Sequence, residues 1–141
     1  MEGKPINVLL VEDDGIDVLN LKRALKKNNI TNPLFVAGNG LEALDMLRGE
    51  NGAKKIDLPR IILLDLNMPK MDGFEFLEQV RKDPELHTSI IYVMTTSSDQ
   101  KDILKAHEFN IAGYIVKPLE FEVFRGIIKT LHESWGINEY P

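Results

Sequence analysis

The sequence contains no cysteine, which excludes disulfide bonds and thiolate metal sites. It has three histidines, His87, His107 and His132, and no two of them have the spacing of a zinc site. No uninterrupted apolar run approaches the roughly 20 residues that span a bilayer. Residues 1–5 also lack the apolar region of a signal peptide. We therefore expect a cytoplasmic protein without a membrane segment.

The sequence also lacks a basic surplus, since its formal net charge is −5. Nucleic-acid-binding domains usually show a basic patch or stripe, so we expect no nucleic-acid partner. The 141 residues are enough for one domain and too few for two domains of ordinary size. We predict a single domain over residues 1–141, with a frayed tail at 136–141.

Apolar runs of strand length alternate with segments of helical periodicity. Strands are expected at 6–11, 34–37, 60–64, 90–94 and 112–116, and helices at 16–27, 41–47, 74–81, 99–108 and 120–135. The strand runs are continuously apolar, which indicates burial on both faces. This order predicts a doubly wound (βα)5 α/β fold with a five-stranded parallel sheet. The long polar connection at 49–59 predicts a mobile surface loop.

Polar side chains follow four of the predicted strands. Glu12 and Asp13 follow the first strand, Asp65 the third, Thr95 the fourth and Lys117 the fifth. The carboxyl ends of parallel strands share one edge of the sheet, and ligands bind beyond that edge. Carboxylates, a hydroxyl and an ammonium group at one edge suit a site for a metal ion and a phosphoryl group.

The chemistry of such a site follows from its charges. Crowded carboxylates raise one another's pKa unless a cation lies between them, and Mg²⁺ prefers oxygen ligands. The backbone carbonyl of Asn67 would complete the metal shell. The Asp65 carboxylate can attack phosphorus to form an aspartyl phosphate, while Lys117 and Thr95 would contact phosphoryl oxygens. The new charge would pull Thr95 inward.

Each of these residues also has a purely structural interpretation. Asp13 and Asp14 are typical of a helix start, residues 95–99 suit a helix cap, and Asp65 suits a turn. Their occurrence together at four strand ends favours a site. The alternative activity is a phosphohydrolase with an aspartyl nucleophile. Such enzymes typically carry a general-acid Asp two residues after the nucleophile, and Asn67 cannot serve in that role.

Four motifs together resemble the receiver domain of two-component response regulators. They are VEDD at 11–14, LDLNMPKMDG at 64–73, MTT at 94–96 and YIVKP at 114–118. The resemblance covers residues from about 6 to 132. It implies the flavodoxin-like, CheY-like fold with strand order 2-1-3-4-5.

The resemblance also implies a role for each site residue. Asp65 would be the phospho-acceptor, and Asp13 would bind Mg²⁺ or Mn²⁺ directly while Glu12 acts largely through water. Thr95 would be the switch hydroxyl, and Tyr114 the aromatic residue that turns inward on activation.

Three further positions, each next to or within one of the motifs, add detail to that resemblance. Lys117 would bind the phosphoryl group and form a cis bond to Pro118. Asp14 makes the acidic run one residue longer than the expected pair. Thr96 is bulkier than the Ala or Gly often found next to the switch threonine, and would narrow access for the hydrolytic water.

The resemblance implies a regulatory protein rather than an enzyme, with self-catalysed phosphorylation and dephosphorylation. A sensor histidine kinase or a phosphotransfer protein would supply the phosphoryl group. The loop before Pro59, the run 95–98 and the lack of an output domain look like the phytochrome-associated single-domain regulators, whose kinase is a bacteriophytochrome. A phosphorelay intermediate and a degenerate receiver that only binds partners are the alternatives.

The last predicted helix carries more apolar residues than one sheet-facing stripe needs. We expect the surplus, Val123 and Ile127, to form a homodimer contact through the face of the fourth helix, fifth strand and fifth helix. The alternative is that these residues pack against the tail or the fourth helix.

Overall fold

The computed structural model describes residues 5–66, 68, 71–96, 99–117, 122–123, 125–127 and 129–130. The strands are β1 (Asn7–Val11), β2 (Leu34–Ala37), β3 (Arg60–Leu64), β4 (Ile90–Thr95) and β5 (Gly113–Val116). The helices are α1 (Gly15–Lys27), α2 (Gly40–Arg48), α3 (Gly73–Lys82) and α4 (Gln100–His107). The described residues between 122 and 130 are also helical, and the rest of the predicted last helix lies outside the described residues.

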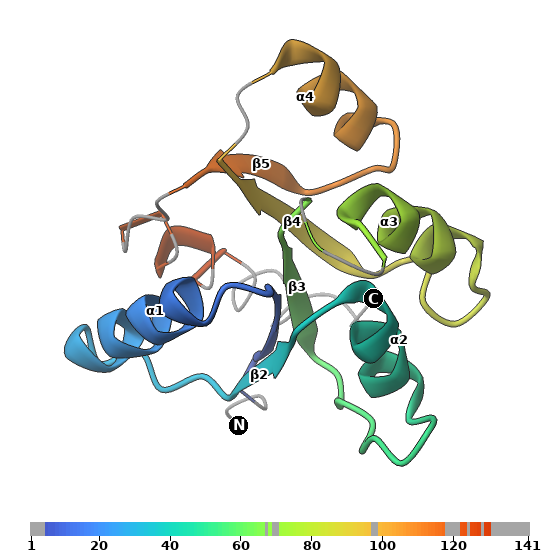
Figure 1. Cartoon of the computed structure of the whole chain (residues 1–141). Helices are drawn as coiled ribbons and strands as arrows, with labels where there is room; N and C mark the ends of the chain where they lie inside the picture. Colours follow the sequence, from blue (N-terminus) through green and yellow to red (C-terminus); the bar gives the residue numbers. More distant parts are fainter. Residues whose placement is uncertain are drawn as a thin grey trace.

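The five strands form one parallel sheet in the order β2-β1-β3-β4-β5 (Figure 1). This confirms the predicted fold class and strand order. The register pairs Val11 with both Ala37 and Leu64, and pairs Thr95 with Val116. The carboxyl ends of β1, β3, β4 and β5 therefore follow one another along the same edge of the sheet.

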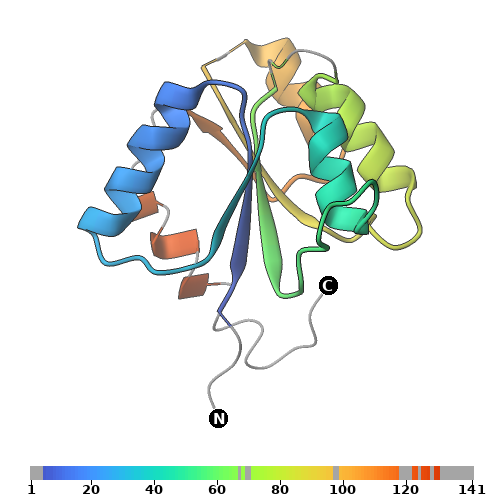
Figure 2. The same ribbon diagram turned by 60° about the horizontal axis from the view of Figure 1, so that its bottom comes forward.

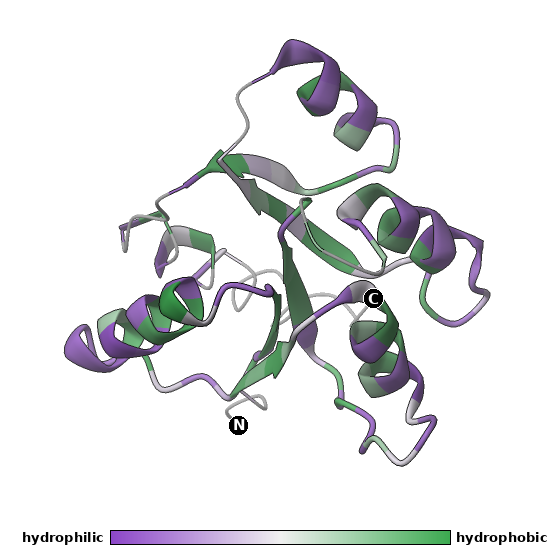
Figure 3. Ribbon diagram, in the orientation of Figure 1, coloured by the Kyte–Doolittle hydropathy of each residue, from purple (hydrophilic) through white to green (hydrophobic). Residues whose placement is uncertain are grey.

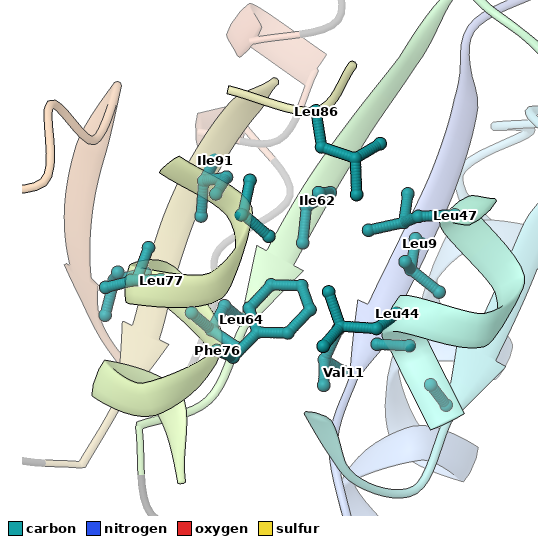
Figure 4. Packing of buried hydrophobic residues seen from close by; sticks show 14 of the residues in the cluster. Leu9, Val11, Leu44, Leu47, Ile62, Leu64, Phe76, Leu77, Leu86 and Ile91 are labelled. Carbon is teal, nitrogen blue, oxygen red and sulfur yellow. The ribbon is translucent and has the colours of Figure 1, made fainter. Parts of the chain in front are cut away.

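Both faces of the sheet are buried, as the continuous apolar runs predicted. Figure 2 shows α1 on one side of the sheet and α2 and α3 on the other. Side chains at alternate positions point to opposite faces, so Ile62 packs with Phe76 of α3 (Figure 4) whereas Ile61 packs in the cluster that contains Leu25 of α1. The strands are accordingly apolar, and polar residues lie mainly on the helices (Figure 3).

Side-chain caps fix where the helices begin. The carboxylates or amides of Asp14, Asn39, Asp72 and Asp99 accept hydrogen bonds from backbone N–H groups in the first turns of α1 to α4. Such caps satisfy donors that the helix itself cannot use. Each of these helices follows a strand of the one parallel sheet, so all four begin on the side where the strands end.

The connection at 49–59 is mostly exposed, as its polar composition predicted, but it is anchored to the core at Ile56. Ile56 is buried, and its N–H donates to the carbonyl of Met46 at 3.0 Å. The Leu58–Pro59 peptide bond is cis. Among the described helices, none has the length and apolar character to cross a membrane.

Candidate functional site

The acidic run after β1 divides into residues with different tasks. The N–H of Glu12 donates to Ala37 at 2.9 Å, continuing the sheet, and its side chain is buried. Asp13 is exposed at the edge of the sheet. The Asp14 side chain instead accepts from the N–H groups of Ile16 at 2.9 Å and Asp17 at 3.4 Å. Asp14 is thus the cap of α1, which explains why the acidic run is one residue longer than the pair.

Asp65 follows β3 and lies beside the same edge. Its N–H donates to the carbonyl of Val11 at 3.0 Å, and its side chain is buried. The chain then folds back, since the N–H of Gly73 donates to Leu66 at 2.9 Å. A Cβ atom at position 73 would lie 2.5 Å from the Cα of Leu66 and 2.9 Å from the carbonyl oxygen of Asp65. This close approach leaves room for glycine alone.

Thr95 and Lys117 come together through the pairing of β4 with β5. Thr95 is fully buried at the end of β4, and its carbonyl accepts from the N–H of Lys117 at 2.8 Å. Tyr114, three residues earlier on β5, is partly buried and packs against the core cluster between the sheet and α2 to α4. Thr96 is exposed. Asn67 and the Lys117–Pro118 bond lie outside the described residues.

The Lys117 ammonium group lies among carboxylates from separate elements. It donates to Oε1 of Glu12 and to Oδ2 of Asp17 at 3.0 Å. Its Nζ atom is 3.6 Å from Oδ2 of Asp65. Asp17 was not among the predicted site residues, because an acid in the first turn of a helix is common and no local pattern links it to a lysine 100 residues away.

These contacts shift the pKa values of the two buried partners. Burial, opposed by the hydrogen bond from Lys117 and supported by the neighbouring Asp65, raises the pKa of Glu12 to about 7. Burial by itself lowers the pKa of Lys117, but hydrogen bonds to Glu12 and Asp17 and the charge of Asp65 outweigh it and raise that pKa. Lys117 therefore supplies one positive charge to a site in which three carboxyl groups lie beside it.

The same residues fit a divalent metal ion. Carboxylate oxygens of Glu12, Asp13 and Asp65 all lie within 4.8 Å of one another. A purely oxygen donor set suits a hard cation such as Mg²⁺ or Mn²⁺. Burial, together with the neighbouring Asp65, raises the pKa of Glu12, so its charged form is costly at this position without a nearby cation.

The fold and this edge define a CheY-like α/β signalling protein. Residues 8–129 match the family model described as the response regulator receiver domain. The chain therefore belongs to the response regulator receiver family and acts in two-component signalling, in which receiver domains take phosphoryl groups from histidine kinases.

Known proteins similar to this chain agree with that membership. It is 35% identical to the probable methanogenesis regulatory protein FilR2 of Methanothrix harundinacea, over 97% of this chain and 88% of that one. It is 30% identical to the response regulator Rcp1 of Synechocystis, over 93% and 89% of the two chains.

Solved structures include phytochrome-associated relatives. The Mn²⁺-bound form of Rcp1 has a TM-score of 0.74 at 29% identity and covers 97% of this chain and 99% of that chain. The bacteriophytochrome response regulator AtBRR has a TM-score of 0.77 at 31% identity, again covering 97% and 99% of the two chains. This chain is thus similar to phytochrome-associated response regulators.

Proposed function

We propose that Asp65 accepts a phosphoryl group from a histidine kinase. The observation that supports this role is the place of its buried carboxylate. Asp65 lies beside Glu12 and Asp13, and its Oδ2 atom is 3.6 Å from the Nζ atom of Lys117. A carboxylate nucleophile needs positive charge around the incoming phosphoryl oxygens, and this chain supplies part of it.

In the transfer, an Asp65 oxygen forms a bond to phosphorus as the bond from phosphorus to the donor breaks. The bond pair leaves with the donor, and a leaving imidazole nitrogen takes a proton from solvent. Lys117 neutralises one phosphoryl oxygen, and the Thr95 hydroxyl donates to another after a side-chain movement. Tyr114 then moves inward as the switch residue.

Mg²⁺ is the proposed ion, and when bound it would neutralise the charge that develops on the phosphoryl oxygens. Asp13, Asp65 and the backbone carbonyl of Asn67 would hold it, with Glu12 acting through water. The Mn²⁺-bound form of the relative Rcp1 supports a divalent ion at this edge.

The test is intact mass spectrometry after incubation with Mg²⁺ and acetyl phosphate. We expect a base-labile phosphoryl adduct on wild type and none on Asp65→Asn. Asp57→Asn is the matched control, because Asp57 is exposed and lies before β3 rather than after it. An adduct on Asp65→Asn, or no adduct on wild type, would contradict the assignment. Decay of the isolated adduct tests self-catalysed dephosphorylation.

The proposed phosphoryl donor is a bacteriophytochrome histidine kinase. The likeness to AtBRR over nearly the whole chain supports this choice. The experiment compares transfer from a phosphorylated bacteriophytochrome kinase with transfer from a chemotaxis kinase. Faster transfer from the bacteriophytochrome kinase is expected, and equal rates would argue against a dedicated partner.

The proposed output includes a homodimer through the face made by α4, β5 and the described helical residues between 122 and 130. Leu104 of α4, Val116 of β5 and Val123 are large apolar residues that are 65%, 45% and 42% exposed. Ile127, by contrast, packs against the cluster beneath α1, so only Val123 of the expected surplus pair is exposed. Phe121, Phe124, Ile128, Leu131 and Trp135 lie outside the described residues.

Light scattering at tens of micromolar, with and without phosphorylation, tests this contact. Leu104→Lys should shift the dimer to monomer. Leu41→Lys is the matched control. Leu41 is also an exposed apolar residue, but it lies on α2 and outside the proposed face, so this variant should stay a dimer. A monomeric wild type in both states would contradict the proposal.

A further inference from the structure

Asp17 contacts Lys117 in the site, although Asp17 lies on a helix and the predicted site residues follow the ends of strands. It lies in the first turn of α1, and its Oδ2 atom accepts a hydrogen bond from the Nζ atom of Lys117 at 3.0 Å. An acidic residue in a first turn also complements the helix dipole. That role needs no contact with Lys117, so the hydrogen bond calls for a separate explanation.

The three carboxylates around Lys117 are not equivalent. Glu12 is hydrogen-bonded to it and has a side chain that is 1% exposed. Asp17 is hydrogen-bonded to it and has a side chain that is 43% exposed. Asp65 lies at 3.6 Å, which is beyond a hydrogen bond. Lys117 is therefore held by Glu12 and Asp17, while Asp65 attracts it only through charge.

We propose that Asp17 is a positioning residue that keeps the Lys117 ammonium short of Asp65 until a phosphoryl group arrives. This inference rests on the proposed function of Asp65. Arrival of a phosphoryl group adds about −1.5 to −2 charges beside Lys117. Lys117 uses two of its three N–H donors in the bonds to Glu12 and Asp17. Contact with a phosphoryl oxygen on Asp65 would draw the ammonium group towards Asp65, and this movement would weaken or break one of the two bonds.

Asp17 is the partner that can be released at lower cost. Water reaches its carboxylate and can replace the lysine, as at exposed ion pairs. Glu12 is buried, so loss of its lysine would leave an unpaired charge away from water. Glu12 therefore keeps Lys117 within the site, and Asp17 sets how readily Lys117 moves within it.

This arrangement predicts that removing the Asp17 charge speeds phosphorylation. Without it, Lys117 can contact the phosphoryl group before breaking any ion pair. We call the rate of adduct formation at saturating acetyl phosphate the limiting rate. For a half-exposed ion pair, removal of the Asp17 charge should raise this rate about two- to fivefold. The effect belongs to the limiting rate, because Lys117 acts in the transfer rather than in the first encounter with the donor.

The experiment measures adduct formation at saturating Mg²⁺ over a series of acetyl phosphate concentrations, in wild type, Asp17→Asn, Asp17→Glu and Asp14→Asn. Asp14 is the matched control, because it lies at the same end of α1 and asparagine retains the cap. Loss of the negative charge of Asp14 or of Asp17 should strengthen binding of acetyl phosphate, which is an anion. The limiting rate should rise in Asp17→Asn alone and return to the wild-type value in Asp17→Glu.

Two further measurements separate this role from a structural one. In a Lys117→Ala background, Asp17→Asn should no longer change the limiting rate, because the proposed effect requires both residues. In the metal-free protein, the ¹⁵N signal of the Lys117 ammonium should shift in Asp17→Asn and stay unchanged in Asp14→Asn. This second readout is independent of phosphorylation.

The possible outcomes distinguish this proposal from the proposed function. If wild type forms no adduct, the role of Asp65 fails and the role of Asp17 fails with it. If wild type forms the adduct but Asp17→Asn has an equal or lower limiting rate, the role of Asp17 alone is overturned. A rise that is shared by Asp14→Asn, or that persists without Lys117, also overturns it.

Discussion

The Nζ atom of Lys117 lies 3.6 Å from Oδ2 of Asp65, too far for a hydrogen bond but close enough for a strong charge interaction. The proposed metal ion would use the same group of carboxylates. Under the proposed function, Lys117 and the metal ion would compete for the negative charge of these carboxylates, although both would be needed around a phosphoryl group.

This competition predicts opposite effects of Lys117→Ala on two measurements. Mg²⁺ should bind about three- to tenfold more tightly, because a neighbouring positive charge is lost. Phosphorylation by acetyl phosphate should be slower, because one phosphoryl oxygen loses its cation. Isothermal titration calorimetry checks the first effect, with Lys26→Ala at the far end of α1 as control. Unchanged or weaker Mg²⁺ binding would show that Lys117 does not compete with the ion.

The raised pKa of Glu12 predicts how stability of the metal-free protein depends on pH. Its ordinary value is 4.5, and the folded value is about 7. Between these values the folded state keeps a proton that the unfolded state releases. The contribution to stability is therefore complete below about pH 4.5 and is lost as the pH rises through about 7. Lys117 stays protonated across this window because its pKa is raised.

Urea denaturation with a chelator at pH 5 and pH 8 measures this effect. Wild type should lose about 1–3 kcal/mol more than Glu12→Gln on going to the higher pH. Saturating Mg²⁺ should reduce the loss, because the ion binds the ionised site. Equal pH dependence in the two proteins would contradict the raised pKa.

The sequence predicted the sheet well because the strands are buried on both faces. Leu34–Ala37 and Arg60–Leu64 have the predicted bounds, and the other strands differ by one residue at an end. The site residues at strand ends followed from the same logic, since parallel strands bring their carboxyl ends together. Glu12, Asp13, Asp65 and Lys117 do lie together.

Contacts between residues that are far apart in the sequence could not be predicted from local sequence patterns. Asp17 looks like any acid in a first turn, and its bond to Lys117 depends on the path of α1 past β5. Ile56 is one apolar residue in a polar loop, and only the packed structure shows that it enters the core. Arg81, a basic residue in the last turn of α3, also has contacts that its local sequence does not indicate.

Arg81 joins α3 to the connections that lead into β4 and β5. Its guanidinium donates to the carbonyls of Phe109 at 2.7 Å, His87 and Ser89 at 2.8 Å, and Asn110 at 3.1 Å. Lysine cannot reproduce this fork of donors. We expect Arg81→Lys to lower the free energy of unfolding by about 2–4 kcal/mol, measured by urea denaturation.

Arg48→Lys is the matched control for that variant. Arg48 is also a helical arginine, but among the described residues its side chain is paired with Asp83 alone, at 2.9 Å. Its loss should change the free energy of unfolding by at most about 1 kcal/mol. Equal effects of the two variants would mean that the carbonyl contacts of Arg81 add no stability beyond that of one ion pair.

Gly73 couples the stability of the fold to the position of Asp65. An alanine Cβ there would lie 2.5 Å from the Cα of Leu66 and 2.9 Å from the carbonyl oxygen of Asp65, so the backbone itself must shift. We expect Gly73→Ala to lower the free energy of unfolding by about 1–3 kcal/mol and to slow phosphorylation at a temperature where the variant is folded. At Gly15, by contrast, a Cβ would meet no atom within 4 Å. Gly15→Ala should therefore stabilise the protein by up to about 1 kcal/mol. A folded Gly73→Ala variant with the wild-type phosphorylation rate would show that the turn after Asp65 tolerates displacement, and that Asp65 is held by β3 rather than by its approach to α3.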